Sequence, residues 1–458
     1  MKVLKSLDGL FEKGFRKELA KVALPIAVQS FMLSAVAVAD TLMLGSVEQN
    51  SMSAVSLATK IQFIQNIIIS TLVAALIVLG AQYWGKKDTK SVDKLFWTTV
   101  KLSGGTSLLF FIGCEFFPQY LMLAFTNDEE LISLACPYLK IAAWSYLISG
   151  FSQCWLALLK ITDHAKDTAV IGVTTVILNI ALNALLIFGL FFFPEMKAEG
   201  AALATTIARL AELVWAVGLT FRKGHIRPAP RDFFLHDKGL THDFFKCMLP
   251  LLGAGLLWGV GFTAYSALMG HIDQNAPAAN SVSGSVIELV CCACNGLASG
   301  GGILVGNALG AGELARGKSI GIRVAALGWL CGIATSLVML LLTPVILSFV
   351  KLNETAAGYL KDMLIVMSVY TVGRVVNTVM INGIFAAGGD TMFDMYSLAV
   401  TMWGIALPLA ALGTFAFSWP VWMIYACTCL DEVGKIPWVI YHFRKYKWVK
   451  DLTRENAQ

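Results

Sequence analysis

Charged residues are scarce in this sequence: they make up 14% of its 458 residues, whereas 57% are hydrophobic and the mean hydropathy is +0.69. Soluble globular proteins carry about 25% charged residues. A deficit of this size over so long a chain excludes an ordinary soluble domain and indicates that most of the chain lies in lipid. The N-terminus also lacks the apolar core of a secretory signal, and it predicts instead a short amphipathic helix on the membrane surface.

Histidines are few, and all six stand at or beyond the ends of the long apolar runs. An enzyme within the membrane would need a nucleophile–base pair or metal-ligating histidines inside those runs, so we expect no enzyme activity. The ten cysteines indicate no disulfide framework, because nearly all lie inside apolar runs, where a thiol behaves as a small hydrophobe. The "CCAC" stretch that begins at Cys291 fits no zinc-binding spacing. We expect no metal or organic cofactor.

Apolar runs long enough to cross a hydrocarbon core of about 30 Å recur almost from end to end. We predict twelve membrane-spanning helices, at residues 22–45, 54–79, 95–117, 133–158, 168–191, 199–221, 247–270, 280–307, 321–349, 360–386, 395–416 and 420–442. The predicted fold class is therefore an all-α polytopic membrane protein.

Lys and Arg gather in the N-terminus, in the C-terminus and in the connections after even-numbered spans. The connections after odd-numbered spans hold only Lys197 and Lys351. The positive-inside rule then places both termini in the cytoplasm. The basic residues behind the net charge of +5 face cytoplasmic lipid headgroups, so no nucleic acid is needed to explain them.

The stretch "GELARGKS", residues 312–319, matches the G-x-x-x-x-G-K-[ST] pattern of nucleotide-binding loops. A functional loop of this kind follows a buried β-strand and opens a helix, whereas this one stands between two predicted spans. We interpret it as a cytoplasmic turn whose Arg316 and Lys318 add to the positive-inside bias. Neither nucleotide binding nor ATP hydrolysis is expected.

The sequence contains an internal repeat: "LPIAVQSFMLSAVAVADTLMLG" from residue 24 aligns with "LPLLGAGLLWGVGFTAYSALMG" from residue 249, at a constant offset of 225. The repeats begin six spans apart, an even number, so they have the same orientation and are related by an axis along the membrane normal. This predicts two pseudo-symmetric six-helix bundles. The predicted parts are an amphipathic segment 1–21, an N-lobe 22–221, a cytoplasmic loop 222–246, a C-lobe 247–443 and a cytoplasmic tail 444–458.

Five strings carry a resemblance to a known family: "ALPIAVQSFMLSAVAVADTLMLG", "LGAQYWGKKD", "ILVGNALGAGE", "LNIALNALLIFGLF" and "NGIFAAGGDT". In their order and spacing, and over nearly the whole chain, the sequence resembles the multidrug and toxic compound extrusion (MATE) transporters in their DinF-like bacterial branch. The resemblance implies twelve helices in two six-helix lobes, a bacterial plasma (inner) membrane location, and export driven by Na⁺ or H⁺ without nucleotide.

Two positions depart from the family's pattern. Many relatives of this branch carry an aspartate four residues after the asparagine on the fifth helix, where this chain has Asn183. Other branches carry a glutamate midway along the seventh helix, where this chain has "LLWGVGF". A known cation site therefore cannot be transferred to this sequence as a whole.

Polar residues inside the spans are candidates for coupling, because an ionisable group there costs at least a few kcal/mol. Asp40 on the first span and Asn179 and Asn183 on the fifth lie at a similar depth, and the two asparagines share one helix face. Their oxygens could hold Na⁺, or a desolvated Asp40 could take up and release H⁺; alternatively, Asp40 bonds to neighbouring helices. We favour H⁺, because Na⁺ usually needs more oxygen ligands than these residues offer.

The second span carries four further polar candidates for the cavity: Lys60, Gln62, Gln65 and Asn66. The last three share one helix face by their i, i+3, i+4 spacing. Lys60 is a candidate counter-ion to Asp40. Hydrogen bonding between helices explains all four equally well.

Glu288 on the eighth span is the only acid deep in the seventh and eighth spans, so it is a candidate carboxylate for a cationic substrate or a proton. Arg374 on the tenth span is its predicted partner. On the twelfth span, Lys435 follows Asp431 by four residues and Glu432 by three, so these charges are expected to satisfy one another.

Arg209 and Glu212 on the sixth span are likewise expected to pair. Aromatic and thioether side chains would suit an adaptable drug pocket, but for each such residue we favour a lipid-facing or core position. These residues are Phe31, Met32, Trp258 and Phe262.

Two transport functions compete. The first is a secondary active antiporter that exports amphipathic, cationic organic compounds in exchange for H⁺ or Na⁺. The second is a flippase for lipid-linked saccharides, whose pyrophosphate would need a basic cavity; deep Lys and Arg are few, chiefly Lys60, Arg209 and Arg374, which favours the first. The expected partners are a small organic substrate and the lipid bilayer, and the chain is expected to act as a monomer.

Overall fold

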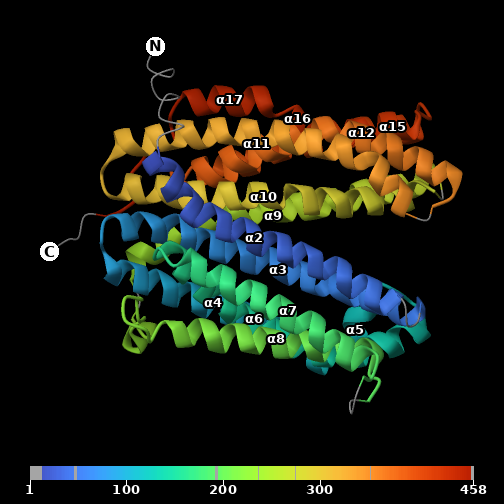
Figure 1. The fold of residues 1–458 in the computed structure, drawn as a ribbon, viewed down its shortest axis with the longest axis horizontal. Coiled ribbons are helices and arrows are strands. Elements are labelled where there is room, and N and C mark those ends of the chain that lie inside the picture. The colour runs from blue at the N-terminus through green and yellow to red at the C-terminus, as the bar shows by residue number, and fades with distance from the viewer. Residues whose placement is uncertain are drawn as a thin grey trace. The chain divides into compact units, whose positions relative to one another are not determined.

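The computed structural model describes residues 13–45, 49–190, 194–235, 237–273, 275–350 and 352–454, with the side chains of residues 13, 35–45, 49–53 and 349 left out. Within these ranges the chain is helical throughout and contains no strand, which confirms the all-α class. The helices at the first nine predicted spans are α2 (Lys13–Gly45), α3 (Gln49–Gly85), α4 (Thr89–Phe116), α6 (Glu129–Ile161), α7 (Ala165–Ile187), α8 (Lys197–Leu219), α9 (Lys238–Ile272), α10 (Ala276–Gly310) and α11 (Leu314–Phe349) (Figure 1).

The last three predicted spans are interrupted. The tenth is α12 (Glu354–Asn377) followed by a π-helical segment, η3 (Thr378–Phe385); the eleventh is α13 (Met392–Leu398), a second π-helical segment, η4 (Ala399–Ala406), and α14 (Leu407–Phe415). The twelfth divides into α15 (Val421–Thr428), α16 (Leu430–Val433) and α17 (Ile436–Arg444). The remaining elements are the short α5 (Pro118–Leu123) and the 3₁₀ turn η2 (Pro230–Phe233).

Ten helical stretches in the part of the chain searched are long and apolar enough to cross a membrane. They correspond to the second to eleventh predicted spans, and α2 and α15–α17 stand at the first and twelfth. Several of these helices begin at a polar cap, where a side-chain oxygen accepts otherwise unpaired backbone N–H groups. Asp128 accepts from Glu130 and Leu131 at the start of α6, and Asn353 accepts from Ala356 at the start of α12.

The internal repeat is visible in the backbone. Lys87, between α3 and α4, and Gly312, between α10 and α11, both adopt the left-handed conformation, with φ of 63° and 78°. These positions differ by the same 225 residues that relate the two repeats in the sequence. The repeat therefore extends to the conformation of a turn in which one copy places lysine and the other glycine.

Two equivalent glycines allow the ends of α3 and α10 to cross closely. A Cβ atom on Gly85 would collide with the backbone of Asn307, and one on Gly310 would collide with the backbone of Gln82. Both pairs are again separated by 225 residues, so each helix presents its glycine to the same position of the other. Glycine is required here because any side chain would force the two backbones apart.

The nucleotide-loop match lies in this turn. α10 ends at Gly310 and α11 begins at Leu314, so the stretch connects two helices and its second half is the first turns of α11. The ammonium of Lys318 lies 3.4 Å from the centroid of the Tyr446 ring, a cation–π contact. Arg316 pairs with Glu313 at 2.9 Å. The interpretation of this match as a turn between spans is confirmed.

Contacts divide the chain into two compact units. Unit 1 contains the described residues up to Ser30, the segment Ala81–Lys87 and the chain from Lys246 onward; unit 2 contains Phe31–Gly80 and Asp88–Phe245. The chain passes between the units within α2, close to the end of α3 and after residue 245. The predicted lobe boundaries, 22–221 and 247–443, stay a prediction.

Each unit has its own helix packing (Figure 1). In unit 2, α6 packs against α4 and α8, and α7 packs against α8. In unit 1, α10 packs against α11, α12 and η3, and α12 packs against α15 and α16. The C-terminal segment is part of unit 1: Trp448 is fully buried, and the side-chain amide of Gln82 donates to the carbonyl of Ala387 at 2.6 Å while its oxygen accepts from Leu452 N–H at 2.6 Å.

Candidate functional site

Unit 1 contains a cavity between α9, α10, α12, η4, α15 and α16, with about 90 Å³ open to the centres of water molecules. Its walls include five aromatic rings and three methionines: Trp258, Phe262, Tyr265, Tyr370, Tyr425, Met269, Met367 and Met402. Its charged lining residues are Glu288, Arg374 and Asp431. Aromatic faces attract cations, and flexible thioethers adapt to different ligand shapes.

The cavity corrects one expectation. Trp258 and Phe262 were expected to face lipid or the core, but both line the cavity, and their rings stack with centroids 5.6 Å apart. They lie four residues apart on α9, so they occupy one face of that helix. Which face of a uniformly apolar helix turns inward depends on the neighbouring helices, and hydropathy alone does not reveal it.

Glu288 and Arg374 meet across the cavity wall, as the sequence predicted. The guanidinium Nη2 of Arg374 lies 3.6 Å from Oε1 of Glu288. Arg374 is also 5.7 Å from the ring centroid of Trp258 and donates a long hydrogen bond of 3.4 Å to the hydroxyl of Tyr370. The Glu288 side chain is 59% exposed, so its carboxylate remains accessible beside its partner.

The charged cluster on the twelfth span is arranged differently from the prediction. Lys435 pairs with Glu432 at 3.1 Å, and Asn377 donates to the carboxylate of Glu432 at 2.8 Å. Asp431 faces the cavity instead, although it is only 3% exposed. Its Oδ1 atom is buried and has no hydrogen-bond partner among the described residues. The expectation that these three charges satisfy one another thus describes Glu432 and Lys435, and Asp431 is the functional candidate that sequence reasoning missed.

A signal for Asp431 exists in the sequence but is ambiguous. Two adjacent acids with a single nearby lysine leave one carboxylate in excess. On a regular helix Asp431, at i−4 from Lys435, is as good a partner as Glu432, at i−3. The helix breaks between α16 and α17, and this break turns Lys435 toward Glu432.

The predicted coupling asparagines lie together in unit 2. Asn179 and Asn183 are both buried on α7, and the amide of Asn183 lies 3.4 Å from the amide oxygen of Asn179. Asn179 in turn donates to the hydroxyl of Thr205 on α8 at 3.3 Å. Asp40 belongs to α2, but its side chain lies outside the described residues. The structure therefore shows a polar connection between α7 and α8, and the role of Asp40 stays a prediction.

The four candidates on α3 separate into different environments. Gln65 is fully buried and its amide donates to the carbonyl of Tyr146 at 2.9 Å and to the hydroxyl of Ser107 at 3.2 Å. Gln62 is half-buried, whereas Lys60 and Asn66 are exposed. Gln65 thus connects three helices of unit 2, as the hydrogen-bonding alternative predicts.

A second buried ion pair lies in unit 2, as expected from the sequence. Arg209 pairs with Glu212 on α8 at 2.9 Å, and the hydroxyl of Ser152 on α6 donates to Glu212 at 2.7 Å. The Glu212 side chain is 4% exposed, and its two oxygens are both bonded. This arrangement joins α6 to α8 and leaves the carboxylate fully satisfied.

The architecture defines the class of protein: a polytopic, all-helical membrane protein built from two repeats, with a ligand-sized cavity inside one unit. The MatE family model matches residues 25–185 and 250–412, two segments whose starts differ by the offset of the internal repeat. The chain therefore belongs to the MATE family of transporters, and the resemblance noted in the sequence is confirmed.

Relatives support the same membership at low identity. The chain is 24% identical over 390 residues to "Uncharacterized transporter YisQ" of Bacillus subtilis, with 85% of each chain covered. It is 22% identical over 457 residues to "Probable multidrug resistance protein NorM" of Thermotoga maritima, covering 97% of this chain and 96% of that one. A solved structure of a mutant of the Vibrio cholerae MATE transporter VcmN has a TM-score of 0.87 at 14% identity, covering 97% of this chain and all of that chain.

Proposed function

We propose that this protein is a proton-coupled antiporter that exports amphipathic organic cations across the bacterial plasma membrane. The observation that carries the proposal is the composition of the cavity in unit 1. Its aromatic and methionine walls suit apolar ligands of varied shape, and its charged lining comprises the carboxylates of Glu288 and Asp431 against the single guanidinium of Arg374. The relatives named as multidrug resistance proteins support the same class of cargo.

The same lining argues against a flippase for lipid-linked saccharides. A pyrophosphate headgroup carries several negative charges and requires basic residues that are free to bind it. Arg374 is the single basic residue among the described residues that line the cavity, and Glu288 already accompanies it at 3.6 Å. Cationic compounds fit this balance better than anionic ones.

Coupling requires a carboxylate that changes its charge during the cycle. Asp431 suits this role because it lines the cavity, is nearly inaccessible to solvent, and has an oxygen without a partner among the described residues. A buried carboxylate without a compensating charge favours its protonated form, and an incoming cation favours its ionised form. Binding of a cationic substrate at Asp431 would then release one proton, which is the exchange that an antiporter needs.

Asp40 remains the second candidate for the coupling group. Its position on α2 in the same repeat as Asn179 and Asn183 suggests an N-lobe site with one negative charge, which matches one H⁺ or one Na⁺ per cycle. We favour H⁺ at both carboxylates, because a Na⁺ site usually collects more oxygen ligands than either location offers. The two sites can be separated experimentally, since they belong to different repeats.

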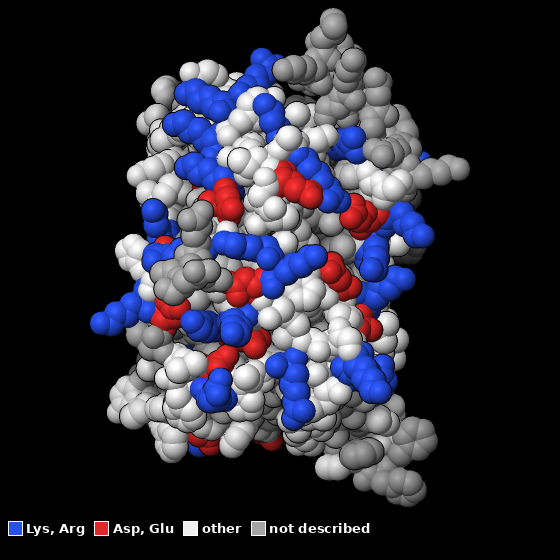
Figure 2. Space-filling model, turned by 90° about the vertical axis from the view of Figure 1, so that its left-hand side faces the viewer, with Lys and Arg blue, Asp and Glu red and all other residues white. Residues whose placement is uncertain are grey.

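The orientation proposed for the chain is that both termini face the cytoplasm and that it acts as a monomer. Lys and Arg side chains are gathered, interspersed with Asp and Glu, on the face seen in Figure 2. A basic face is attracted to the anionic headgroups of the cytoplasmic leaflet, and each surface Lys or Arg contributes about 1 kcal/mol to this attraction. The charge distribution supports the orientation that the positive-inside rule predicts.

The test is efflux of a fluorescent organic cation from proteoliposomes under an imposed pH gradient or an imposed Na⁺ gradient. Wild-type protein should respond to the pH gradient, and Asp431→Asn should lose that response. Asp362→Asn is the matched control, because Asp362 is an exposed carboxylate on α12 that lies outside the cavity lining. Asp40→Asn reports on the N-lobe site in the same assay.

Each outcome decides between specific statements. If Asp431→Asn retains full gradient-driven efflux while Asp40→Asn loses it, the coupling group is in the N-lobe. A response of the wild type to Na⁺ alone would reverse the choice of ion. Uptake of an anionic saccharide lipid in place of cation efflux would favour the flippase.

A further inference from the structure

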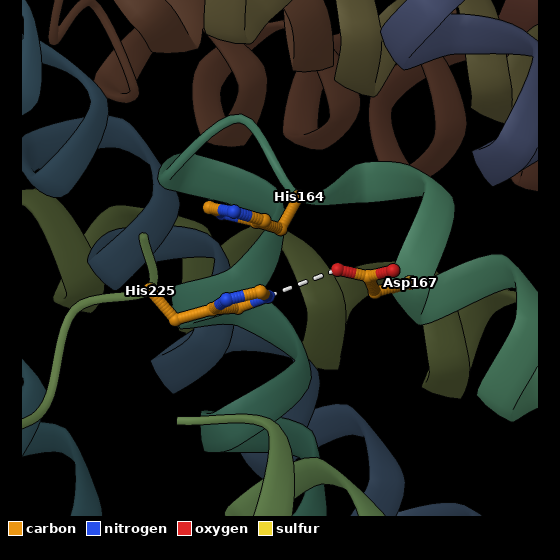
Figure 3. A group of neighbouring side chains, drawn as sticks. All are labelled: His164, Asp167 and His225. Atoms are coloured by element: carbon orange, nitrogen blue, oxygen red, sulfur yellow. Dashed lines mark hydrogen bonds and ion pairs between the residues drawn. The ribbon is translucent and has the colours of Figure 1, made fainter. Parts of the chain in front are cut away.

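We propose that His164, Asp167 and His225 form a binding site for a divalent transition-metal ion of the Zn²⁺ class, independent of the transport cavity. The three residues come from two connections of unit 2. His164 stands immediately before α7, Asp167 lies in the first turn of α7, and His225 follows α8 (Figure 3). One ligand atom from each residue lies within 4.8 Å of the other two.

The donor set fits this class of metal. Two imidazole nitrogens and one carboxylate oxygen are a common zinc ligand set, with a fourth position left for water. In tetrahedral Zn²⁺ with bonds of about 2.0–2.1 Å, neighbouring ligand atoms are about 3.3 Å apart. The Nε2 atom of His225 and the Oδ2 atom of Asp167 are already 3.0 Å apart. The protein thus holds one edge of the coordination tetrahedron without a metal.

The imidazoles have nitrogen atoms that the described residues leave unused. The Nδ1 atoms of His164 and His225 are both buried and lack a hydrogen-bond partner within the described part of the chain. Although His164 occupies the N-cap position of α7, its side chain makes no capping hydrogen bond. Buried polar atoms without partners are costly, and coordination of a metal by one ring nitrogen would satisfy that atom directly.

Charge and geometry set what binding requires. Asp167 lies at the positive end of the α7 dipole, where its carboxylate offsets the repulsion that a cation would otherwise meet. The two imidazole rings stack with centroids 3.8 Å apart and planes inclined by 29° (Figure 3). A metal ion lies close to the plane of each imidazole that binds it, so binding tilts His164 out of the stack toward Asp167.

Unit 1 provides an internal comparison. There Asp390, before α13, lies 2.6 Å from His442 near the end of α17, and the stacked ring is Phe393, with centroids 4.1 Å apart. A histidine–aspartate pair under an aromatic ring therefore stabilises this kind of connection without any metal. Only the arrangement in unit 2 adds a second imidazole, which is the ligand that a metal site needs.

The experiment is a Zn²⁺ titration of purified, tag-free protein in competition with a chelating dye. The wild type should bind one equivalent, and Zn²⁺ should raise its apparent melting temperature. His164→Phe copies the arrangement of unit 1 and should abolish binding while leaving the metal-free melting temperature unchanged. Since changing even an outer-shell partner of a metal commonly weakens affinity about 10–100-fold, Asp167→Asn should weaken it by at least about 10-fold. His442→Gln is the matched control and should bind like the wild type.

Cobalt distinguishes this site from the cysteines. Co²⁺ bound by imidazole and carboxylate shows d–d absorption without a thiolate-to-cobalt charge-transfer band, whereas binding at any of the ten cysteines adds that band. Absence of stoichiometric Zn²⁺ binding to the wild type would overturn the proposal, as would a thiolate band or undiminished binding by His164→Phe. If His164→Phe does not fold, His164→Asn serves as the ligand deletion with the same expected loss.

Discussion

Asp431 and Glu432 are adjacent carboxylates with opposite surroundings, so their amide variants should have opposite effects. Glu432 pairs with Lys435, whose side chain is 3% exposed. Glu432→Gln leaves this ammonium buried without its anion, and removing one partner of a buried ion pair costs about 3–5 kcal/mol. Asp431→Asn conserves shape and removes a charge that no described residue pairs, so its effect on unfolding free energy should stay within about 1 kcal/mol or be stabilising.

These free energies convert to melting temperatures. An unfolding entropy of about 2.1 cal/mol/K per residue, over 458 residues, gives roughly 1 °C for each kcal/mol. Glu432→Gln should therefore lower the apparent melting temperature by about 3–5 °C. Asp431→Asn should lower it by no more than about 1 °C.

The assay combines two measurements on the same detergent-purified samples. Thermal unfolding followed by tryptophan fluorescence reports stability, and pH-driven efflux from proteoliposomes, normalised to folded protein, reports coupling. Glu432→Gln should melt early but transport, and Asp431→Asn should melt normally but lose the response to the pH gradient. The reasoning is refuted if Asp431→Asn destabilises as strongly as Glu432→Gln and still couples transport to protons.

Three further predictions test the topology, the nucleotide-loop match and the helix crossing. Cysteine in place of Asn275 should react with an impermeant thiol reagent from outside and cysteine in place of Lys87 should not; outside labelling of the latter would contradict the twelve-span topology. Lys318→Ala should transport normally, and purified protein should hydrolyse no ATP; an ATPase activity that this substitution abolishes would overturn our interpretation. Gly310→Leu should reduce both transport and melting temperature by pushing α10 off the backbone of Gln82, and wild-type values of both would show that the close approach is dispensable.

The sequence alone determined the membrane class, the spans and the repeat. Hydropathy is a local property, so a run of apolar residues predicts a helix in lipid whatever lies beside it. The pairing of Glu288 with Arg374 was also predictable, because charges deep in spans are costly and few, which leaves each with few possible partners. The match between the repeats predicted equivalent turns, which the left-handed Lys87 and Gly312 confirm.

Tertiary structure decided what depends on neighbours distant in sequence. On a regular helix both Asp431 and Glu432 could reach Lys435, and only the break in the twelfth span assigns the lysine to Glu432. The inward position of Trp258 depends on α10 and α12, because lipid and a protein core are equally apolar and hydropathy does not distinguish them. His164 and His225 are 61 residues apart in the sequence, and the packing of α7 against α8 places their rings in contact. Composition and periodicity describe a residue's own environment, whereas a site is a relation between residues that only the packed chain creates.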